Sequence, residues 1–405
     1  MLSAAAAASR DVSVTLLEPN EKLGRKLYIT GKGRCNLTND CTPDEVLRNV
    51  PRNGRFLYSA ISRFPPAAVK GFFAELGVPL KTERGGRVFP QSDKAADVID
   101  ALLRSLRRNK VCIRRERALH ICAKADAVTG VVTDQGELKC KAVILATGGA
   151  SYPLTGSRGD GYRMAAELGH IIVSPKPSLV PLVAEGEECL RMQGLALKNV
   201  AVRVKTGGGR IIYSEQGELL FTHFGLSGPL ILSASAHMRE FGQESYHILI
   251  DLKPGLDEKK LDARILRDFE KKANREFANA LDELLPRLMV PVVVERSGIP
   301  PETRVNSVTR AQRRSLLELL KAFRVDIVGP RPIAEAIVTS GGVEVSQIEP
   351  NSMESKLTSG LFFAGEVIDV DAYTGGFNLQ IAWCTGKAAG EGAAKYCMGE
   401  KTNER

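Results

Sequence analysis

The pattern of apolar and polar positions indicates an α/β region in two separate parts of the chain. Short, almost uninterrupted apolar runs rich in Val, Ile and Leu are typical of buried parallel strands. Three such runs occur, at 12–17, 141–149 and 360–369, and an alanine-rich segment with the composition of a helix precedes the first. Because ligands bind beyond the carboxyl ends of parallel strands, we expect a binding site where these runs end.

Between about residues 190 and 330 the pattern changes to antiparallel alternation. Residues 200–205 alternate between apolar and polar side chains and lead through a Gly-rich turn into a second alternating run. Two further segments, 257–273 and 310–323, carry apolar residues at helical spacing over charged faces. This stretch therefore predicts a separate β-rich domain with a helical subregion.

The two patterns together define the expected domain order. We expect an α/β, Rossmann-like domain formed by two segments, 1–189 and 332–405, with a β-rich domain inserted at 190–331. A chain of 405 residues is long enough for this, and 43 % hydrophobic with 25 % charged residues is ordinary for a globular protein.

Cysteine usage and hydropathy narrow the protein class. No window approaches the length of apolar sequence that spans a membrane. The eight cysteines form no C-x-x-C motif and no metal-type pairing, so we expect reduced thiols, a cytoplasmic location and no metal site.

The net charge of +9 raises the question of an acidic partner. Basic residues cluster at 107–117 and 310–314, but no aromatic side chains for base stacking lie between them. We interpret the clusters as solvated faces that also attract a phosphorylated cofactor, and we do not expect a nucleic-acid partner.

Three glycine-rich segments carry the candidate chemistry. The segment 21–40, "EKLGRKLYITGKGRCNLTND", combines glycines with the charges of Arg25, Lys26 and Arg34 and the amide of Asn36, as would suit a phosphorylated, planar ligand. The segment 152–170 continues the glycine-rich sequence beyond the second apolar run and leads into a helix. The segment 364–394 places Gly375 and Gly376 directly before a helix that begins near Asn378, where free backbone N–H groups favour negative charge.

These motifs resemble the HI0933-like (YhiN/BaiN-like) family of FAD-dependent oxidoreductases. The resemblance rests on "GRKLYITGKGRCNLTN", "ATGGASYPLTGSRGDGY", "FTHFGLSGPLIL" and "AGEVIDVDAYTGGFNLQIAWCTG", which follow one another in this order along the chain. It implies a two-segment FAD domain of the glutathione-reductase type, a β-barrel-like insertion and FAD as cofactor, with NAD(P)H as a candidate electron donor. The implied reaction is flavin-mediated reduction of a conjugated C=C in a small organic substrate.

The resemblance also implies roles for individual residues. Glu18 would bind the adenosine ribose, and Arg25 and Lys26 would lie near the phosphates. The remaining cofactor-binding residues implied in this way are Gly33, Arg34, Cys35, Asn36, Ala118, Thr147, Gly148, Gly149, Gly365, Glu366, Asp369, Gly375, Gly376, Phe377 and Asn378. The family pattern defines no catalytic residue, so Arg34, Tyr152 and Tyr373 are candidates.

One part of the family pattern has no counterpart in this sequence. Members of the family begin with a strand and a Gly-rich dinucleotide turn ahead of the helix that here is "LSAAAAAS", and no residue of this chain matches that turn. We therefore expect weaker FAD binding than in relatives that carry it.

Several alternatives remain open. An oxygen-dependent amine or aminoketone oxidase and a flavin-containing nucleic-acid-modifying protein both fit the motifs. A dithiol flavoenzyme would use Cys35 and Cys41, but their spacing has one residue more than the C-x-x-x-x-C of such enzymes. A non-catalytic remnant would follow from true loss of the Gly-rich turn. Substrate identity and oligomeric state are not determined by the sequence.

Overall fold

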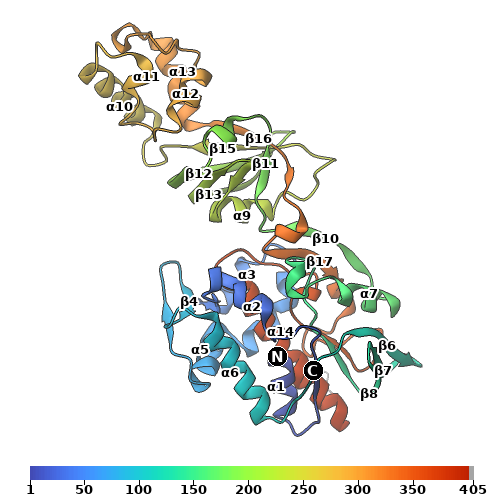
Figure 1. Ribbon diagram of the computed structural model, residues 1–405. Helices are drawn as coiled ribbons and strands as arrows, with labels where there is room; N and C mark the ends of the chain where they lie inside the picture. The colour runs from blue at the N-terminus through green and yellow to red at the C-terminus, as the bar shows by residue number, and fades with distance from the viewer. Residues whose placement is uncertain (401–405) are drawn as a thin grey trace. The chain divides into compact units, whose positions relative to one another are not determined.

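The computed structural model describes residues 1–400 and divides the chain into two compact units. The first comprises Met1–Ser178 together with the segment from Pro332 onward, and the second comprises Leu179–Arg331 (Figure 1). The second unit begins earlier than the expected residue 190, because strand β11 (Leu182–Ala184) pairs with strands of the inserted domain.

The first unit is Rossmann-like and contains two parallel strand pairs. Strand β1 (Thr15–Leu17) pairs with β5 (Cys112–Arg114), and β9 (Val143–Leu145) pairs with β18 (Leu361–Phe363). The strands are parallel as the sequence predicts, and no strand within residues 1–400 joins the two pairs into one sheet. Strands β1, β9 and β18 are shorter than the apolar runs that predicted them.

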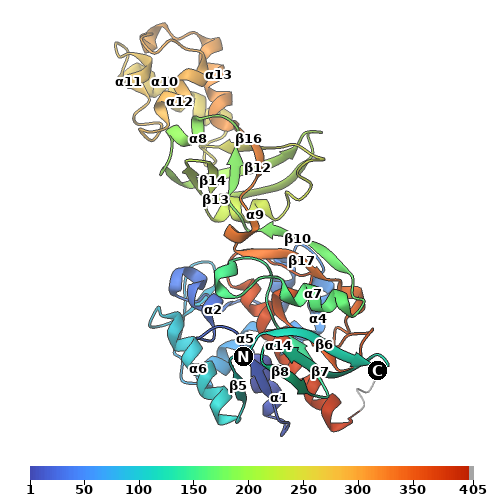
Figure 2. The same ribbon diagram turned by 45° about the vertical axis from the view of Figure 1, so that its right-hand side comes forward.

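Smaller sheets and helices surround these pairs, as Figures 1 and 2 show. One sheet has the order β2-β4-β3, a second is the meander β6-β7-β8, and β10 pairs antiparallel with β17. The bounds of these strands are β2 Thr38–Asn39, β3 Leu80–Thr82, β4 Arg87–Pro90, β6 Ala118–Lys124, β7 Ala127–Thr133, β8 Gly136–Lys139, β10 Ile172–Ser178 and β17 Val338–Val343. The helices are α1 Leu2–Ala8, α2 Arg25–Ile29, α3 Pro43–Arg48, α4 Tyr58–Arg63, α5 Pro66–Glu75, α6 Ala95–Arg108, α7 Asp160–Glu167 and α14 Phe377–Met398.

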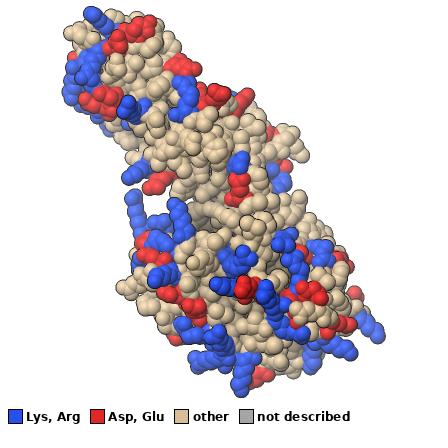
Figure 3. All heavy atoms as spheres, viewed as in Figure 1, with Lys and Arg blue, Asp and Glu red and all other residues tan. Residues whose placement is uncertain are grey.

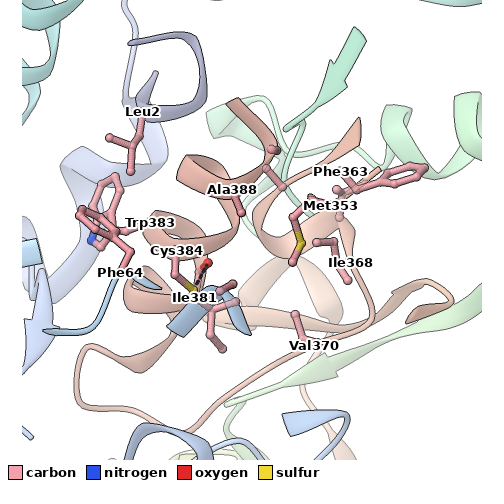
Figure 4. Close-up of a cluster of buried hydrophobic side chains, with 14 of the residues drawn as sticks. Leu2, Phe64, Met353, Phe363, Ile368, Val370, Ile381, Trp383, Cys384 and Ala388 are labelled. Carbon is pink, nitrogen blue, oxygen red and sulfur yellow. Dashed lines mark hydrogen bonds between the residues drawn. The ribbon is translucent and has the colours of Figure 1, made fainter. Parts of the chain in front are cut away.

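Helix α14 runs through the core of this unit. Its Trp383 lies beside Phe64 and Leu2 on one side, and Phe363 and Met353 belong to the same buried cluster on the other (Figure 4). Small residues let α1 approach α14 closely, since a Cβ at Gly390 would lie 2.4 Å from the carbonyl oxygen of Ser3. The alanine-rich sequence of α1 therefore serves close helix packing.

The second unit contains a closed six-stranded barrel of order β11-β14-β13-β12-β15-β16, which confirms the expected β-barrel-like insertion. The further strands are β12 Ala196–Thr206, β13 Ile211–Thr222, β14 Gly225–Ser227, β15 Tyr246–Asp251 and β16 Phe323–Pro330. The helices are α8 Glu188–Arg191, α9 Pro229–Ser235, α10 Glu258–Lys271, α11 Phe277–Ala280, α12 Val290–Ser297 and α13 Arg310–Lys321. Helices α10 to α13 form the helical subregion and share one apolar core with the barrel.

No helix among residues 1–400 combines the length and the apolar character that crossing a lipid bilayer requires.

Candidate functional site

The segment after α2 follows an unusual backbone path. Gly31, Lys32, Gly33 and Cys35 all have positive φ, at 57°, 59°, 85° and 59°. The path is held closed because the Cys35 amide donates to the Thr30 carbonyl at 3.0 Å. Successive amides in such conformations form concave, anion-attracting surfaces. A Cβ placed on Gly33 would meet no described atom within 4 Å, so this backbone faces open space.

Asn36, which follows this segment, holds a buried acceptor in a fixed position. Its side-chain Oδ1 is buried and has no hydrogen-bond partner among residues 1–400. The next residue, Leu37, is held at both of its backbone groups, since its amide donates to the Val88 carbonyl at 2.9 Å and its carbonyl accepts from Trp383 Nε1 at 2.9 Å. A buried acceptor of this kind is costly unless a ligand supplies a donor.

A hydrogen-bond network links α2 to the ends of the parallel strands. Lys26 Nζ lies 2.6 Å from Glu366 Oε2 and donates to Ser151 Oγ at 2.7 Å. Glu366 Oε1 accepts from the Ser151 hydroxyl at 3.1 Å and from the Thr339 amide at 2.7 Å. The segments beyond β9 and β18 are thereby joined to the basic helix α2.

The glycines beyond β9 permit close packing within the protein. A Cβ at Gly149 would lie 2.3 Å from Thr339 Oγ1 and 2.8 Å from Glu366 Oε1, so any larger residue would displace the Glu366 carboxylate. Gly148 has φ 74°, and Thr147 lies against the helix residue Gly161. These positions are therefore glycines for reasons of packing as well as any contact with a ligand.

Glu18 directly follows β1, as the sequence suggests, and is part of a second polar group. Its Oε1 accepts from the backbone amide and the side-chain Nδ2 of Asn20, at 3.0 and 2.7 Å. Asn20 also donates to the Thr155 carbonyl and accepts from Arg25 Nη1. Arg25 and Glu18 thus lie in one group, whereas Lys26 points to the Glu366 network.

Asp369 is almost completely buried beyond β18. Asn53 Nδ2 donates to both its carbonyl, at 2.7 Å, and its Oδ2, at 3.0 Å, and Arg52 lies 3.5 Å from the same oxygen. Asn53 can act from this position because it adopts a left-handed backbone conformation with φ 55°. Asp369 is therefore held by a loop that the sequence analysis did not single out.

The N-terminus of α14 packs closely against β2. Gly376 has φ 100°, and a Cβ there would lie 2.4 Å from the Thr38 carbonyl oxygen, while the Gly375 carbonyl accepts from Asn39 Nδ2 at 3.0 Å. The side-chain amide of Asn378 is turned back onto the preceding loop, where it bonds both backbone groups of Ala372. Any donor to a cofactor at this helix end is therefore a backbone amide rather than the Asn378 side chain.

The remaining predicted cofactor residues lie in different surroundings. Ala118 begins β6 and pairs with Thr133. Gly365 begins a short 3-10 turn, and its amide donates to Thr385 Oγ1 at 3.0 Å. Phe377 is buried at the start of α14.

The catalytic candidates differ in their freedom to act. Arg34 is bound by Glu83 and Asp93 and lies 4.1 Å from the Phe89 ring centroid, so the guanidinium is committed to structural contacts. Tyr373 lies in the loop that Asn378 holds. Tyr152 is half-buried with φ 49°, and burial, with a smaller contribution from Glu335, raises the pKa of its phenol.

The thiols near this region are poor redox groups. Cys35 is buried, and burial raises its pKa to about 12. Burial also raises the pKa of Cys41 to about 11, with a smaller effect of nearby carboxylates. Neither thiol forms a thiolate readily at neutral pH, which disfavours the dithiol flavoenzyme. Residues 1–400 also contain no cluster of side chains that could hold a metal ion.

The residues present fit a flavin dinucleotide. One segment of the chain contains the basic Lys26, the open backbone at Gly33 and the buried acceptor of Asn36. Strand β2 follows this segment, and the N-terminus of the long helix α14 packs against β2. Sequence reasoning missed Asn20, Asn53, Ser151 and Thr339, which hold the implied cofactor residues. Only Ser151 lies inside a motif, so no local signal identifies the other three.

Comparisons with known proteins identify the family of the chain. Residues 1–392 match the family model described as HI0933-like protein Rossmann domain. The chain is 30% identical over 397 residues to a 3-dehydro-bile acid delta(4,6)-reductase of Clostridium scindens, covering 97% of this chain and 95% of that protein. It is 30% identical over 401 residues to a ribosomal RNA dihydrouridine synthase of Haemophilus influenzae, covering 96% and 94%.

Among solved structures, a 3-ketosteroid-delta4-(5alpha)-dehydrogenase from Rhodococcus jostii RHA1 has a TM-score of 0.50 with 15% identity, over 97% of this chain and 94% of that one. At this identity the likeness concerns the fold alone.

Proposed function

The chain belongs to the HI0933-like family of FAD-dependent oxidoreductases, and we propose that it reduces a carbon–carbon double bond conjugated with a carbonyl group, with NAD(P)H as electron donor. The observation that carries the proposal is the full-length similarity to two differently named relatives. A delta(4,6)-reductase of a 3-oxo steroid and a synthase of dihydrouridine both saturate a C=C next to a carbonyl. We propose the same chemistry here, on a small organic substrate.

The site residues support this chemistry in separate roles. Bound flavin would supply the hydride equivalent. We assign Glu18 to the adenosine ribose through Oε2, because Asn20 already occupies Oε1. Lys26 and Glu366 connect two segments that, in this proposal, would lie on either side of the cofactor. The backbone amides at the start of α14 would stabilise negative charge on the reduced ring.

Saturation of a C=C also requires a proton, and we assign its delivery to Tyr152. A phenol is protonated at neutral pH, as a general acid must be, and the burial that raises the pKa of Tyr152 makes it a weaker acid than an exposed tyrosine. Its left-handed backbone is costly for an aromatic residue and marks a position where strain is tolerated. The neighbouring Ser151, fixed by Lys26 and Glu366, limits how far this tyrosine can move.

Product analysis tests the proposal. FAD-loaded protein is incubated without oxygen with NADH or NADPH and a 3-oxo-Δ4,6 steroid, and the products are examined by mass spectrometry. We expect a gain of two hydrogens for each reduced double bond. Oxidation of an amine with consumption of oxygen, and no turnover of the enone, would instead support the oxidase alternative.

A second candidate function is reduction of a uracil ring in RNA. Two observations favour it, namely the rRNA dihydrouridine synthases among the relatives and the exposed basic residues at the end of α6. Figure 3 shows basic side chains gathered at the lower edge of the Rossmann-like unit, and Arg107, Arg108 and Lys110 are exposed in the described chain. Dihydrouridine content of ribosomal RNA from cells with and without the protein separates the two candidates.

A further inference from the structure

The side chain of Asn36 is the most informative polar group outside the networks already described. Its Oδ1 is buried without a hydrogen-bond partner in the described chain. Two other buried oxygens in the same state are less restrictive, because Ser340 Oγ belongs to a hydroxyl that can rotate and Asp268 Oδ1 belongs to a carboxylate whose second oxygen is bound by Arg264. Asn36 Oδ1 is neither a hydroxyl nor half of a bonded carboxylate, and the backbone of Cys35 and Leu37 on either side of it is held by hydrogen bonds.

The chemistry of an orphaned acceptor restricts the group that can satisfy it. Phosphate oxygens at neutral pH are acceptors, so the pyrophosphate of a dinucleotide cannot serve. A hydrogen-bond donor is required, and the oxidised flavin ring system carries a single N–H, at N3. The acceptor therefore discriminates between parts of the cofactor, whereas the basic residues of the same segment do not.

The position of Asn36 favours the ring over the sugar hydroxyls. Two residues further along the chain, the Thr38 carbonyl lies against Gly376 at the N-terminus of α14. Two residues of extended chain span about 7 Å, so Asn36 lies near that helix end. The helix end favours the electron-rich C2 carbonyl and N1 of a flavin, and the C2 carbonyl is the direct neighbour of N3–H.

From this arrangement, which rests on the proposed FAD cofactor, we infer that Asn36 Oδ1 accepts a hydrogen bond from flavin N3–H. The Asn36 side chain then selects the pyrimidine edge of the ring, while the amides of α14 bind the oxygen beside it. Open space at Gly33 gives the ring access to this position.

Binding of FAD and of 3-methyl-FAD, whose N3 carries a methyl group in place of hydrogen, tests the inference directly. We expect wild-type protein to bind 3-methyl-FAD about tenfold more weakly than FAD. We expect Asn36→Leu to bind FAD about tenfold more weakly than wild type and to bind both flavins alike. Equal affinities of wild type for the two flavins would overturn the inference and leave the flavoenzyme assignment intact, whereas failure of wild type to bind FAD would overturn the proposed function.

Three controls accompany this experiment: a variant that keeps the acceptor, a melting measurement and a substitution at an unrelated asparagine. Asn36→Asp keeps an acceptor and should retain FAD affinity, so a loss equal to that of Asn36→Leu would contradict the acceptor role. Asn36→Leu should melt no lower than wild type without FAD, because the acceptor it removes is unpaired in the protein alone. Asn109→Leu, a half-buried asparagine at the end of α6, is the matched control and should leave the ratio of the two flavin affinities unchanged.

Discussion

Lys26 Nζ lies 2.6 Å from Glu366 Oε2, although the two residues are 340 positions apart in the sequence. The contact joins the two segments of the Rossmann-like unit at the place where β9 and β18 end, and both side chains are largely shielded from solvent. The ends of the strands are thus coupled to the basic helix α2 by one ion pair.

The first prediction concerns the strength of this pair. Lys26→Met should destabilise the protein by about 1.5 to 3 kcal/mol, because a charge-assisted hydrogen bond is lost while Ser151 and Thr339 still hold Glu366. Urea unfolding of Lys26→Met, Glu366→Gln and the double variant measures the interaction. If the changes in the free energy of unfolding of the two single variants add up to that of the double variant, the pair contributes nothing to stability. Lys22→Met, at an exposed lysine, is the control.

The second prediction separates backbone strain from ligand contact at Gly33. Gly33 and Gly169 have nearly equal φ, 85° and 84°, and a Cβ on either would meet no described atom within 4 Å. Alanine at each position should cost a similar 1 to 2 kcal/mol of folding free energy, an approximate value for left-handed backbone. Only Gly33→Ala should weaken FAD binding in a fluorescence titration, and equal FAD affinities in the two variants would remove Gly33 from the site.

The third prediction concerns proton delivery. Tyr152→Phe should lower the rate of C=C reduction by about 10²- to 10⁴-fold, because the general acid is lost. Oxidation of NAD(P)H with an artificial electron acceptor should be unchanged, since that reaction does not need the proton. Tyr58→Phe, at a tyrosine that is 62% exposed, is the control. Unimpaired enone reduction by Tyr152→Phe would assign the proton to another donor.

The fourth prediction is a loss of stability in mild acid caused by His170. Its Nδ1 lies 3.1 Å from the Ala165 carbonyl, and its Nε2 lies 2.8 Å from Ser355 Oγ. The lone pairs of Ser355 Oγ are taken by the backbone amides of Leu357 and Thr358, which both donate to it. The Ser355 hydroxyl therefore donates to Nε2, and the neutral ring is the form that fits. Burial lowers the pKa of His170 below its ordinary value of 6.5.

The sign of the effect follows from that lowered pKa. Below about pH 6.5 the unfolded chain binds a proton that folded His170 does not, so the free energy of unfolding falls as pH decreases toward the folded pKa. The free energy of unfolding is measured from roughly pH 7.5 to pH 5, the range in which histidines usually titrate. It should show this decline in wild type and in His120→Gln. The decline should be smaller in His170→Gln, and an identical pH profile in all three proteins would exclude His170 as its source.

The sequence predicted those features that depend on local chemistry. Apolar runs identified β9 and β18, alternation identified β12 and β13, and the position of Glu18 after a strand followed from the same pattern. Closure of the barrel was implied only by the resemblance to the family, because no local pattern shows the pairing between β11 and β16, which are far apart in the chain. The direction of an amide is equally non-local, as Asn378 shows by bonding Ala372 instead of facing outward.

For the site residues too, the sequence showed local features and not those that depend on the three-dimensional structure. Glycine-rich motifs indicated which loops matter, but not which glycine is required by the protein and which faces a ligand. Gly376 is required by the Thr38 carbonyl, while Gly33 faces open space, and only the three-dimensional structure distinguishes them. Asn53 carries no motif at all and becomes visible only through its bonds to Asp369.

The most direct test of the account is the visible absorption of the FAD-loaded protein through one anaerobic cycle. The bound flavin is first reduced with a single equivalent of NADPH or NADH and is then mixed with a conjugated enone. The account predicts that the spectrum of oxidised flavin returns on addition of the enone, with an equal amount of saturated product. Return of the oxidised spectrum only on admission of oxygen, or a purified protein that takes up no FAD, would contradict it.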